Sequence, residues 1–143
     1  KMFHRVFFTP FDRREAGAWR TQPVYVRTST GWKEFPDYRK IQPLVSETFS
    51  ELGRLDCGRP PLERAALLHF RIVSIHPFVD GNGRSVRFLS AAAAVQGGCS
   101  PVYIPVESRK EYIASLERGE SAFVDFFLET ASLQEPESRE PRL

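Results

Sequence analysis

The pattern of hydrophobic and polar residues along the chain predicts a mainly helical protein. Apolar side chains recur every three or four positions, the spacing that gathers them on one face of an α-helix. Proline or glycine marks the end of nearly every such segment. The segments expected to be helical are residues 2–8, 43–53, 61–75, 82–96, 109–118 and 122–131.

Local signals refine three of these helices. Four residues at helical spacing are expected to form the core face of the 61–75 segment: Leu62, Ala66, Phe70 and Val73. Ser108 with Glu111 matches a capping box, and Ser121 is expected to cap the last helix.

Residues 21–36 follow a different pattern. Val24, Val26, Trp32 and Phe35 alternate with threonine, serine and charged residues, and Gly31 supplies a turn. This predicts a β-hairpin. A lone hairpin is marginally stable in water, so it has to pack against a larger part of the protein. From the pattern alone it is an ordinary surface loop.

Composition narrows the class of protein. A chain of 143 residues, 41% of them hydrophobic, can bury one core and form one domain. Lysine and arginine exceed aspartate and glutamate by only two, with the signs interspersed, which argues against nucleic-acid or membrane-surface binding. No apolar run approaches the ~20 residues of a membrane span. The two cysteines lack metal-ligand spacing, so a zinc enzyme is not expected.

The stretch His76–Arg87 concentrates the chemistry of the chain. Pro77 disfavours helical geometry at the residue before it, so the helix should end at about His76, with that residue extended. Gly81 and Gly83 permit positive φ and close approach of a ligand. The next helix should open at Asn82, and its N-terminus offers unpaired N–H groups to an anion.

Three charged side chains complete a possible phosphate site. Arg84 and Arg87 lie three positions apart, hence on one helical face, and can both point at a phosphate chain. Asp80 is placed to hold Mg²⁺, which typically binds one or two carboxylates together with phosphate oxygens. His76 supplies a proton acceptor beside them.

Each part taken separately has an ordinary structural explanation. A histidine before proline is usually structural, a Gly-Asn-Gly sequence is usually a turn, and paired arginines usually face solvent. A hydrolase built on Ser74, His76 and Asp80 is disfavoured because nothing resembles a nucleophile elbow. A nucleotide-binding module without activity stays open as an alternative.

The ordered combination resembles the Fic domain. The sequence HPFVDGNGRSVR at residues 76–87 matches the motif of that family in full. The segment Ala16–Arg20 with Val24–Val26, and the segment His69–Ile75, are similar to the regions that precede the flap and the motif in the family. The resemblance implies a helical bundle with a small β-hairpin flap over about residues 21–36.

The resemblance also implies an activity. Fic proteins typically transfer AMP from ATP to a hydroxyl of a target protein, on serine, threonine or tyrosine; other members transfer UMP, phosphocholine or phosphate, and removal of AMP is a further alternative. In the phosphate-transferring branch a lysine replaces the second glycine, which here is Gly83. AMP transfer with release of pyrophosphate is therefore favoured, with ATP as substrate and Mg²⁺ as cofactor.

Residue roles follow from the same resemblance. His76 is the expected base and Asp80 the metal ligand. The expected phosphate ligands are Gly81, Asn82, Gly83, Arg84 and Arg87. The expected target-binding flap residues are Thr28, Trp32, Lys33, Glu34 and Phe35.

Many Fic proteins are held inactive by a helix carrying Ser or Thr, three residues, then Glu and Gly or Asn. The pattern does not occur here: Ser115 is followed four positions later by Gly119, and Thr130 by Gln134. The source of inhibition stays open: it is an upstream segment, a separate antitoxin protein, or none at all. Arg87 is the expected partner of an inhibitory glutamate.

We expect one Fic domain over residues 1–133, a disordered tail or linker at 134–143, and a cytoplasmic location, with delivery into a host cell as an alternative.

Overall fold

The computed structural model describes residues 1–134, without the side chains at positions 3 and 7. Most of the predicted tail, residues 135–143, lies outside the described residues. Gln134 accepts a hydrogen bond from the backbone N–H of Tyr103 (2.9 Å) and donates to its carbonyl, so it is attached to the folded part.

The predicted fold class, mainly helical with a small hairpin, is confirmed. The described residues form α1 (Met2–Phe8), β1 (Tyr25–Thr28), β2 (Gly31–Glu34), α2 (Ile41–Leu52), α3 (Pro61–Ile75), α4 (Asn82–Gln96), α5 (Arg109–Arg118) and α6 (Glu120–Ser132). Short 3₁₀ turns precede α2 and α5, at Tyr38–Lys40 and Val106–Ser108. None of the described helices is both long and apolar enough to cross a membrane.

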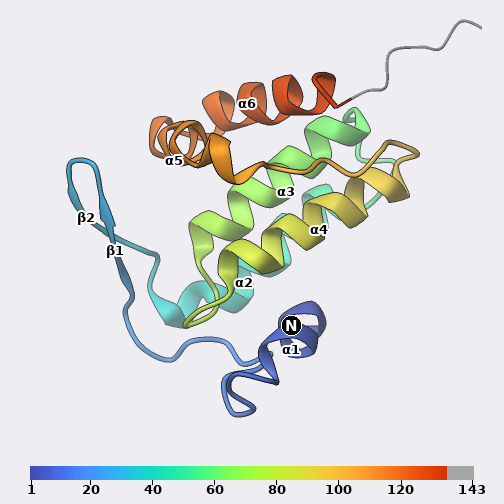
Figure 1. Ribbon diagram of the computed structural model, residues 1–143. Coiled ribbons are helices and arrows are strands. Elements are labelled where there is room, and N and C mark those ends of the chain that lie inside the picture. Colours follow the sequence, from blue (N-terminus) through green and yellow to red (C-terminus); the bar gives the residue numbers. More distant parts are fainter. Residues whose placement is uncertain (135–143) are drawn as a thin grey trace, which may run out of the picture.

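Helix α3 lies at the centre of the bundle (Figure 1). It packs against α4, α6 and α2, while α5 packs on α6 and α1 lies outside against α4. Two groups of buried residues fill the spaces between these helices. The larger group joins α3, α4 and α6 around Phe123 and Phe127, and the smaller one surrounds Ile41, Ile72 and Val86.

The predicted core face of α3 was too narrow. Ala66 is fully buried, but Leu62, Phe70 and Val73 are only half-buried, and the most buried positions include Leu68 and His69. A helix enclosed on several sides buries more than the single stripe that periodicity selects. His69 lies inside the bundle, with Nδ1 3.1 Å from Ser90 Oγ and Nε2 3.0 Å from the hydroxyl of Tyr112, as a structural histidine does.

Ser108 is the N-cap of α5, as predicted, but neither predicted serine makes a capping bond. Ser108 immediately precedes α5, but its side chain makes no capping bond, because it ends a 3₁₀ turn and has near-helical angles. Helix α6 begins at Glu120, with Gly119 as N-cap. Gly119 both ends α5 and starts α6 at a φ of 112°, a conformation available to glycine, so no separate cap residue separates the two helices.

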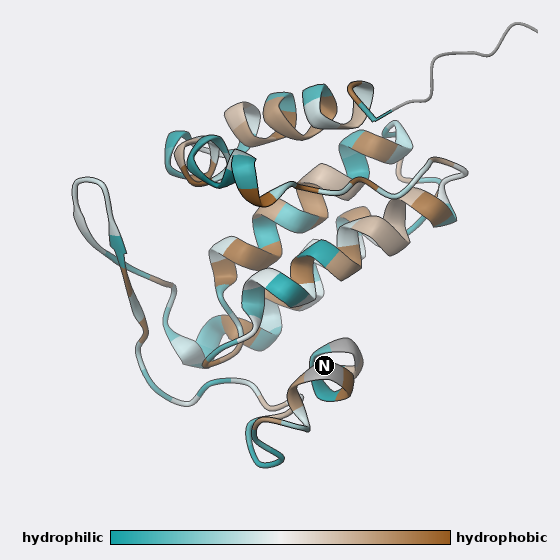
Figure 2. Ribbon diagram, in the orientation of Figure 1, coloured by the Kyte–Doolittle hydropathy of each residue, from teal (hydrophilic) through white to brown (hydrophobic). Residues whose placement is uncertain are grey.

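The hairpin projects from the helical bundle (Figure 1), and few of the hydrophobic residues of the protein lie on it (Figure 2). Its strands are antiparallel, with Tyr25 opposite Glu34 and Thr28 opposite Gly31. The turn is formed by Ser29 and Thr30, one position before the predicted Gly31. At this tip the backbone N–H and the hydroxyl of Ser29 donate to the carboxylate of Glu117 on α5 (3.2 and 2.6 Å).

Candidate active site

The motif predicted from sequence forms the connection between α3 and the start of α4. Helix α3 ends at Ile75, as predicted, and His76 is its C-cap. The backbone of His76 is left-handed, with φ 52° and ψ 61°, so the predicted extended conformation was wrong. Among the described residues it is the only one other than glycine with positive φ. Such a conformation at a bulky residue is strained and has to be held by its surroundings.

The imidazole of His76 is substantially buried. It stacks on the ring of Phe35, with centroids 4.0 Å apart, and its Nδ1 atom is buried without a hydrogen-bond partner. This burial lowers the pKa of His76 to about 4, with a smaller contribution in the same direction from Arg20 and Lys33. The carbonyl of Val73 and the carboxylate of Asp80 oppose the pKa shift. The imidazole is therefore neutral at pH 7, the form that a proton acceptor needs.

The loop that follows is fixed by buried contacts. Phe78 is buried and stacks on His4, with centroids 3.8 Å apart, as an anchor for the loop. Asn82 accepts a hydrogen bond from the backbone N–H of Phe78 (3.0 Å) and donates one to its carbonyl (2.8 Å). The carboxamide of Asn82 thereby holds the loop together, and its contact with phosphate stays a prediction.

The N-terminus of α4 leaves backbone donors open. The first bond within the helix is donated by the N–H of Ser85 to the carbonyl of Gly81 (3.0 Å), so the N–H groups of residues 82–84 precede it. Gly81 has a φ of 76° and lies against the ring of His4, where a side chain would collide. Open N–H groups and the positive end of the helix dipole favour an anion at this position.

The two motif arginines have different neighbours. The guanidinium of Arg84 lies over Phe8 and Phe11, 5.8 and 5.3 Å from the ring centroids, and 3.7 Å from Asp80 Oδ2. A Cβ at Gly83 would be 3.7 Å from Nη1 of Arg87, which places that guanidinium beside the first turn of α4. Both arginines are exposed, so both are available to a ligand.

These features agree with what the comparisons with known proteins show. The chain matches the pattern of the Fic/DOC family over residues 1–94. It belongs to the Fic/DOC family. It is 39% identical over 113 residues to protein adenylyltransferase fic-1 of Caenorhabditis briggsae and 46% identical over 118 residues to protein adenylyltransferase Fic of Drosophila willistoni. These alignments cover 79% and 76% of this chain but only 22% and 21% of the relatives.

Solved structures of Fic proteins share the fold. Fic-1 from Caenorhabditis elegans superposes with a TM-score of 0.75 at 32% sequence identity, covering 93% of this chain and 40% of that one. A Fic domain protein from Bacteroides thetaiotaomicron gives 0.73 at 25% identity, covering 82% and 53%. The fold predicted from the resemblance is therefore confirmed, in a chain that spans about a fifth of its curated relatives.

Asp80 offers the Fic motif a single exposed carboxylate. Its Oδ1 accepts from the N–H of Gly81 (2.5 Å) and its Oδ2 lies near Arg84. No group of three or more metal-ligating side chains occurs among residues 1–134. A single exposed carboxylate next to N–H groups that favour an anion is sufficient for Mg²⁺, because this ion takes most of its other ligands from phosphates and water.

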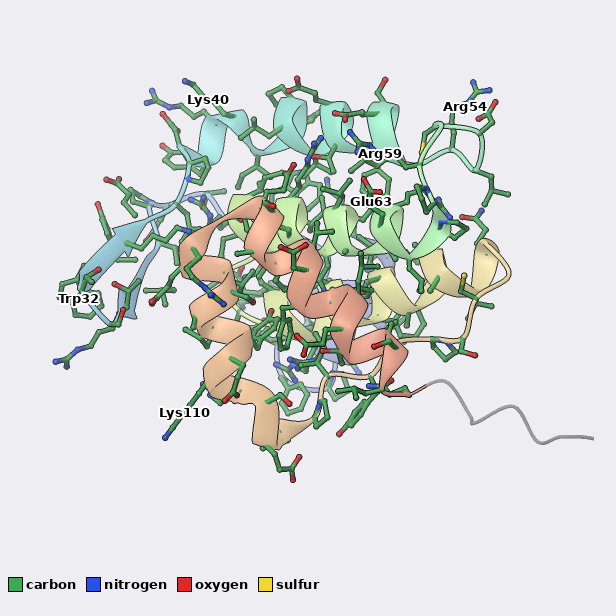
Figure 3. All side chains as sticks on the ribbon, turned by 90° about the horizontal axis from the view of Figure 1, so that it is seen from above. Trp32, Lys40, Arg54, Arg59, Glu63 and Lys110 are labelled. Carbon is green, nitrogen blue, oxygen red and sulfur yellow. The ribbon has the colours of Figure 1, made fainter. Side chains whose placement is uncertain are left out.

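The predicted flap residues divide into two groups. Thr28, Trp32, Lys33 and Glu34 lie on the hairpin strands, and Trp32 at the outer end is 72% exposed (Figure 3). Phe35 instead lies at the base of the hairpin, where its ring covers His76. The expected flap thus contributes one side chain directly to the motif, and the remaining four lie on the exposed strands.

Sequence reasoning gave no role to two buried residues that support the motif. His4 accepts from the N–H of Gly17 (2.9 Å) and donates from Nε2 to the carbonyl of Asp80 (2.8 Å). Arg20 contacts the backbone of His76. The only signal was for Arg20, which lies in the Ala16–Arg20 segment of the resemblance, because bonds to backbone carbonyls leave no mark in a single sequence.

Proposed function

We propose that this domain transfers AMP from ATP to a hydroxyl side chain of a target protein. The observation that carries the proposal is the pairing of a neutral, buried imidazole at the end of α3 with an open helix N-terminus at the start of α4. Five residues separate His76 from Asn82 in the chain, so the proton acceptor and the anion site belong to one short, braced loop.

In the proposed reaction, His76 takes the proton of the target hydroxyl. Because Nδ1 is buried, Nε2 is the nitrogen that would accept it. The hydroxyl oxygen forms a bond to the α-phosphorus, and the bond from that phosphorus to the oxygen bridging to the β-phosphorus breaks. Pyrophosphate leaves with the bonding electron pair. Gly83 stands where the phosphate-transferring branch carries lysine, which favours attack at the α-phosphorus.

The start of α4 would stabilise the charge that develops on the phosphate. Backbone N–H groups of Asn82, Gly83 and Arg84 are donors fixed before the substrate arrives, which is the arrangement that lowers a barrier most. Arg84 and Arg87 would hold the remaining phosphates. Asn82 then contributes its N–H, while its side chain keeps the loop in shape.

Asp80 would hold Mg²⁺ together with phosphate oxygens of ATP. When bound, the ion would neutralise charge on the phosphates and orient the leaving pyrophosphate. The residue is suited to this role because its carboxylate is exposed next to the helix start.

The partners remain part of the proposal. The exposed β2 strand can receive an extended target segment by backbone hydrogen bonds, which aligns a hydroxyl with little regard to sequence. Arg87, exposed beside the phosphate site, is the proposed contact of an inhibitory carboxylate, whether it comes from another part of a longer chain or from a separate protein. A cytoplasmic location is likewise proposed.

ATP labelled at the α- or the γ-phosphate tests this function. Each would be incubated with Mg²⁺, a cell lysate and either this domain or its His76→Ala variant. We expect label to enter protein from α-labelled ATP alone and to require His76. Label arriving from γ-labelled ATP would contradict AMP transfer, and equal labelling by the variant would contradict the role of His76.

A further inference from the structure

Arg20 is a buried cation whose bonds are all to backbone carbonyls. The residue is 2% exposed and lies between the base of the hairpin and the end of α3. Its Nε donates to the carbonyl of His76 (2.7 Å), its Nη1 to Gln22 (2.9 Å), and its Nη2 to Pro36 (2.6 Å) and Ile75 (3.4 Å). Burying a guanidinium is costly unless its donors are paired, and here each of its three nitrogens donates to a carbonyl.

The four carbonyls come from two places that are far apart in the sequence. Ile75 and His76 form the end of α3, where carbonyls lack helical partners. Gln22 and Pro36 flank the hairpin on its two sides. In addition, the backbone N–H of Arg20 donates to the carbonyl of Pro77 (2.9 Å). One residue therefore ties both ends of the flap to the start of the catalytic loop.

Two features of His76 depend on this junction. Its left-handed backbone is unfavourable for a residue with a side chain and needs an outside constraint, and the bond from Arg20 Nε to its carbonyl is such a constraint. Its imidazole is covered by Phe35, the neighbour of Pro36, whose carbonyl Arg20 also holds. Backbone direction and ring cover are thus fixed by the same guanidinium.

We propose that Arg20 is a positioning residue for AMP transfer, which orients His76 toward the substrate by clamping the end of α3 to both ends of the flap. This inference rests on the proposed function. Arg20 is almost fully buried, so the proposal gives it no contact with nucleotide or target. A displacement of about 1 Å at a reacting group can cost on the order of 100-fold in rate, so loss of the clamp should act mainly on kcat.

Arg64 provides a matched control. It is 1% exposed and donates to the carbonyl of Leu52 (3.4 Å) at the end of α2 and to that of Ala93 (2.8 Å) on α4. It is the same kind of buried arginine bonded to helix carbonyls, but it lies away from the motif loop. A merely structural role would make the two arginines equivalent.

The experiment compares Arg20→Met, Arg20→Lys and Arg64→Met with the wild-type chain. For Arg20→Met we expect kcat to fall about 100-fold while KM for ATP changes less than about threefold. Arg64→Met should lower the midpoint of unfolding at least as much, with kcat within about threefold of wild type. Lysine keeps the charge and some donors, so Arg20→Lys should recover about tenfold of the lost kcat.

Backbone ¹³C chemical shifts of His76 supply a readout independent of activity. They should report a left-handed residue in the wild type and in Arg64→Met, and leave that range in Arg20→Met. Unchanged His76 shifts, or equal losses of kcat in the two methionine variants, would overturn the proposal. If Arg20→Met does not fold, Arg20→Lys with wild-type kcat and shifts would overturn it. A wild-type chain that transfers no AMP would refute the proposed function, whereas the chemical shifts would still decide on the clamp.

Discussion

The motif loop at residues 76–82 and the flap are built on opposite principles. In the loop, Phe78 and Asn82 are buried, and the side chain of Asn82 is bonded at both ends to the backbone. In the flap, every residue of β2 is exposed, and the tip is attached to the bundle through Glu117. The loop is therefore fixed before any ligand arrives, whereas the exposed flap can change its conformation when a target binds.

This difference matches the two tasks of a transferase that acts on proteins. Phosphorus chemistry needs donors and a proton acceptor held to within a fraction of an ångström. Recognition of an extended segment through backbone bonds tolerates variation in side chains. Phe35 lies where the two regions meet, since it belongs to the flap by sequence and to the His76 site by contact.

The contrast between a fixed motif loop and an adaptable flap fails if the loop is not catalytic. Replacing His76 with alanine should lower AMP transfer by about 10²–10⁴-fold, because the reaction loses its proton acceptor. ATP binding should stay close to wild type, as the phosphate site lies on α4. Isothermal titration with ATP and a labelled-ATP transfer assay would measure the two effects. Loss of ATP binding would instead mean that His76 only supports the structure.

The rigidity of the loop is tested by Asn82→Ala. The variant leaves the buried N–H and carbonyl of Phe78 without partners, which should lower the free energy of unfolding by about 1–3 kcal/mol. Gln96→Ala, at the exposed end of the same helix, should change it by less than about 0.5 kcal/mol. Urea denaturation of both variants gives the values. Equal stabilities would show that Asn82 does not brace the loop.

The phosphate site is tested by Arg87→Ala. Loss of one exposed charge-assisted contact to a phosphate should weaken ATP binding about tenfold. Arg118→Ala removes an exposed arginine from α5 and should leave ATP binding unaltered. Fluorescent-nucleotide titration is sensitive enough for this range. Identical dissociation constants for Arg87→Ala and wild type would remove Arg87 from the site.

The smallest effect is expected at the flap tip. Glu117→Gln replaces the carboxylate that accepts two bonds from Ser29 with a weaker acceptor. Because both partners are exposed, the bond contributes little to stability, and amide hydrogen exchange across residues 25–34 should accelerate by less than about fivefold. A change of orders of magnitude would show that the flap is a locked element rather than an adaptable one.

The sequence was most informative where structure is decided locally. Pro77, Gly81 and the Gly97–Gly98 pair set the ends of α3 and α4, so both helices and the loop between them were predictable. The sequence identified His76 as the expected base, but the cause of its neutral state, burial under Phe35, needed the fold. Local patterns misled where a neighbouring turn replaced a side-chain cap, as at Ser108.

Long-range backbone contacts account for the rest. Arg20 and His4 meet the motif across more than fifty positions of sequence, through carbonyl groups that every residue possesses. The bonds from the Asn82 side chain to the backbone of Phe78 were not predictable, because an asparagine carboxamide can bind either a ligand or the backbone and a single sequence does not distinguish the two. The left-handed turn at His76 was missed for the same reason.

The protonation state of His76 is the central claim, and NMR titration of its imidazole tests it directly. Burial lowers the pKa, so titration is expected at about 4 instead of near 6.5. The unfolded chain then binds more protons between these values, and this residue should add stability as pH rises from about 4 to about 6.5, with that stability lost again on acidification. A pKa of about 4, with the acid limb of kcat/KM near the same pH, would support a neutral base. Titration at or above 6.5 would contradict it.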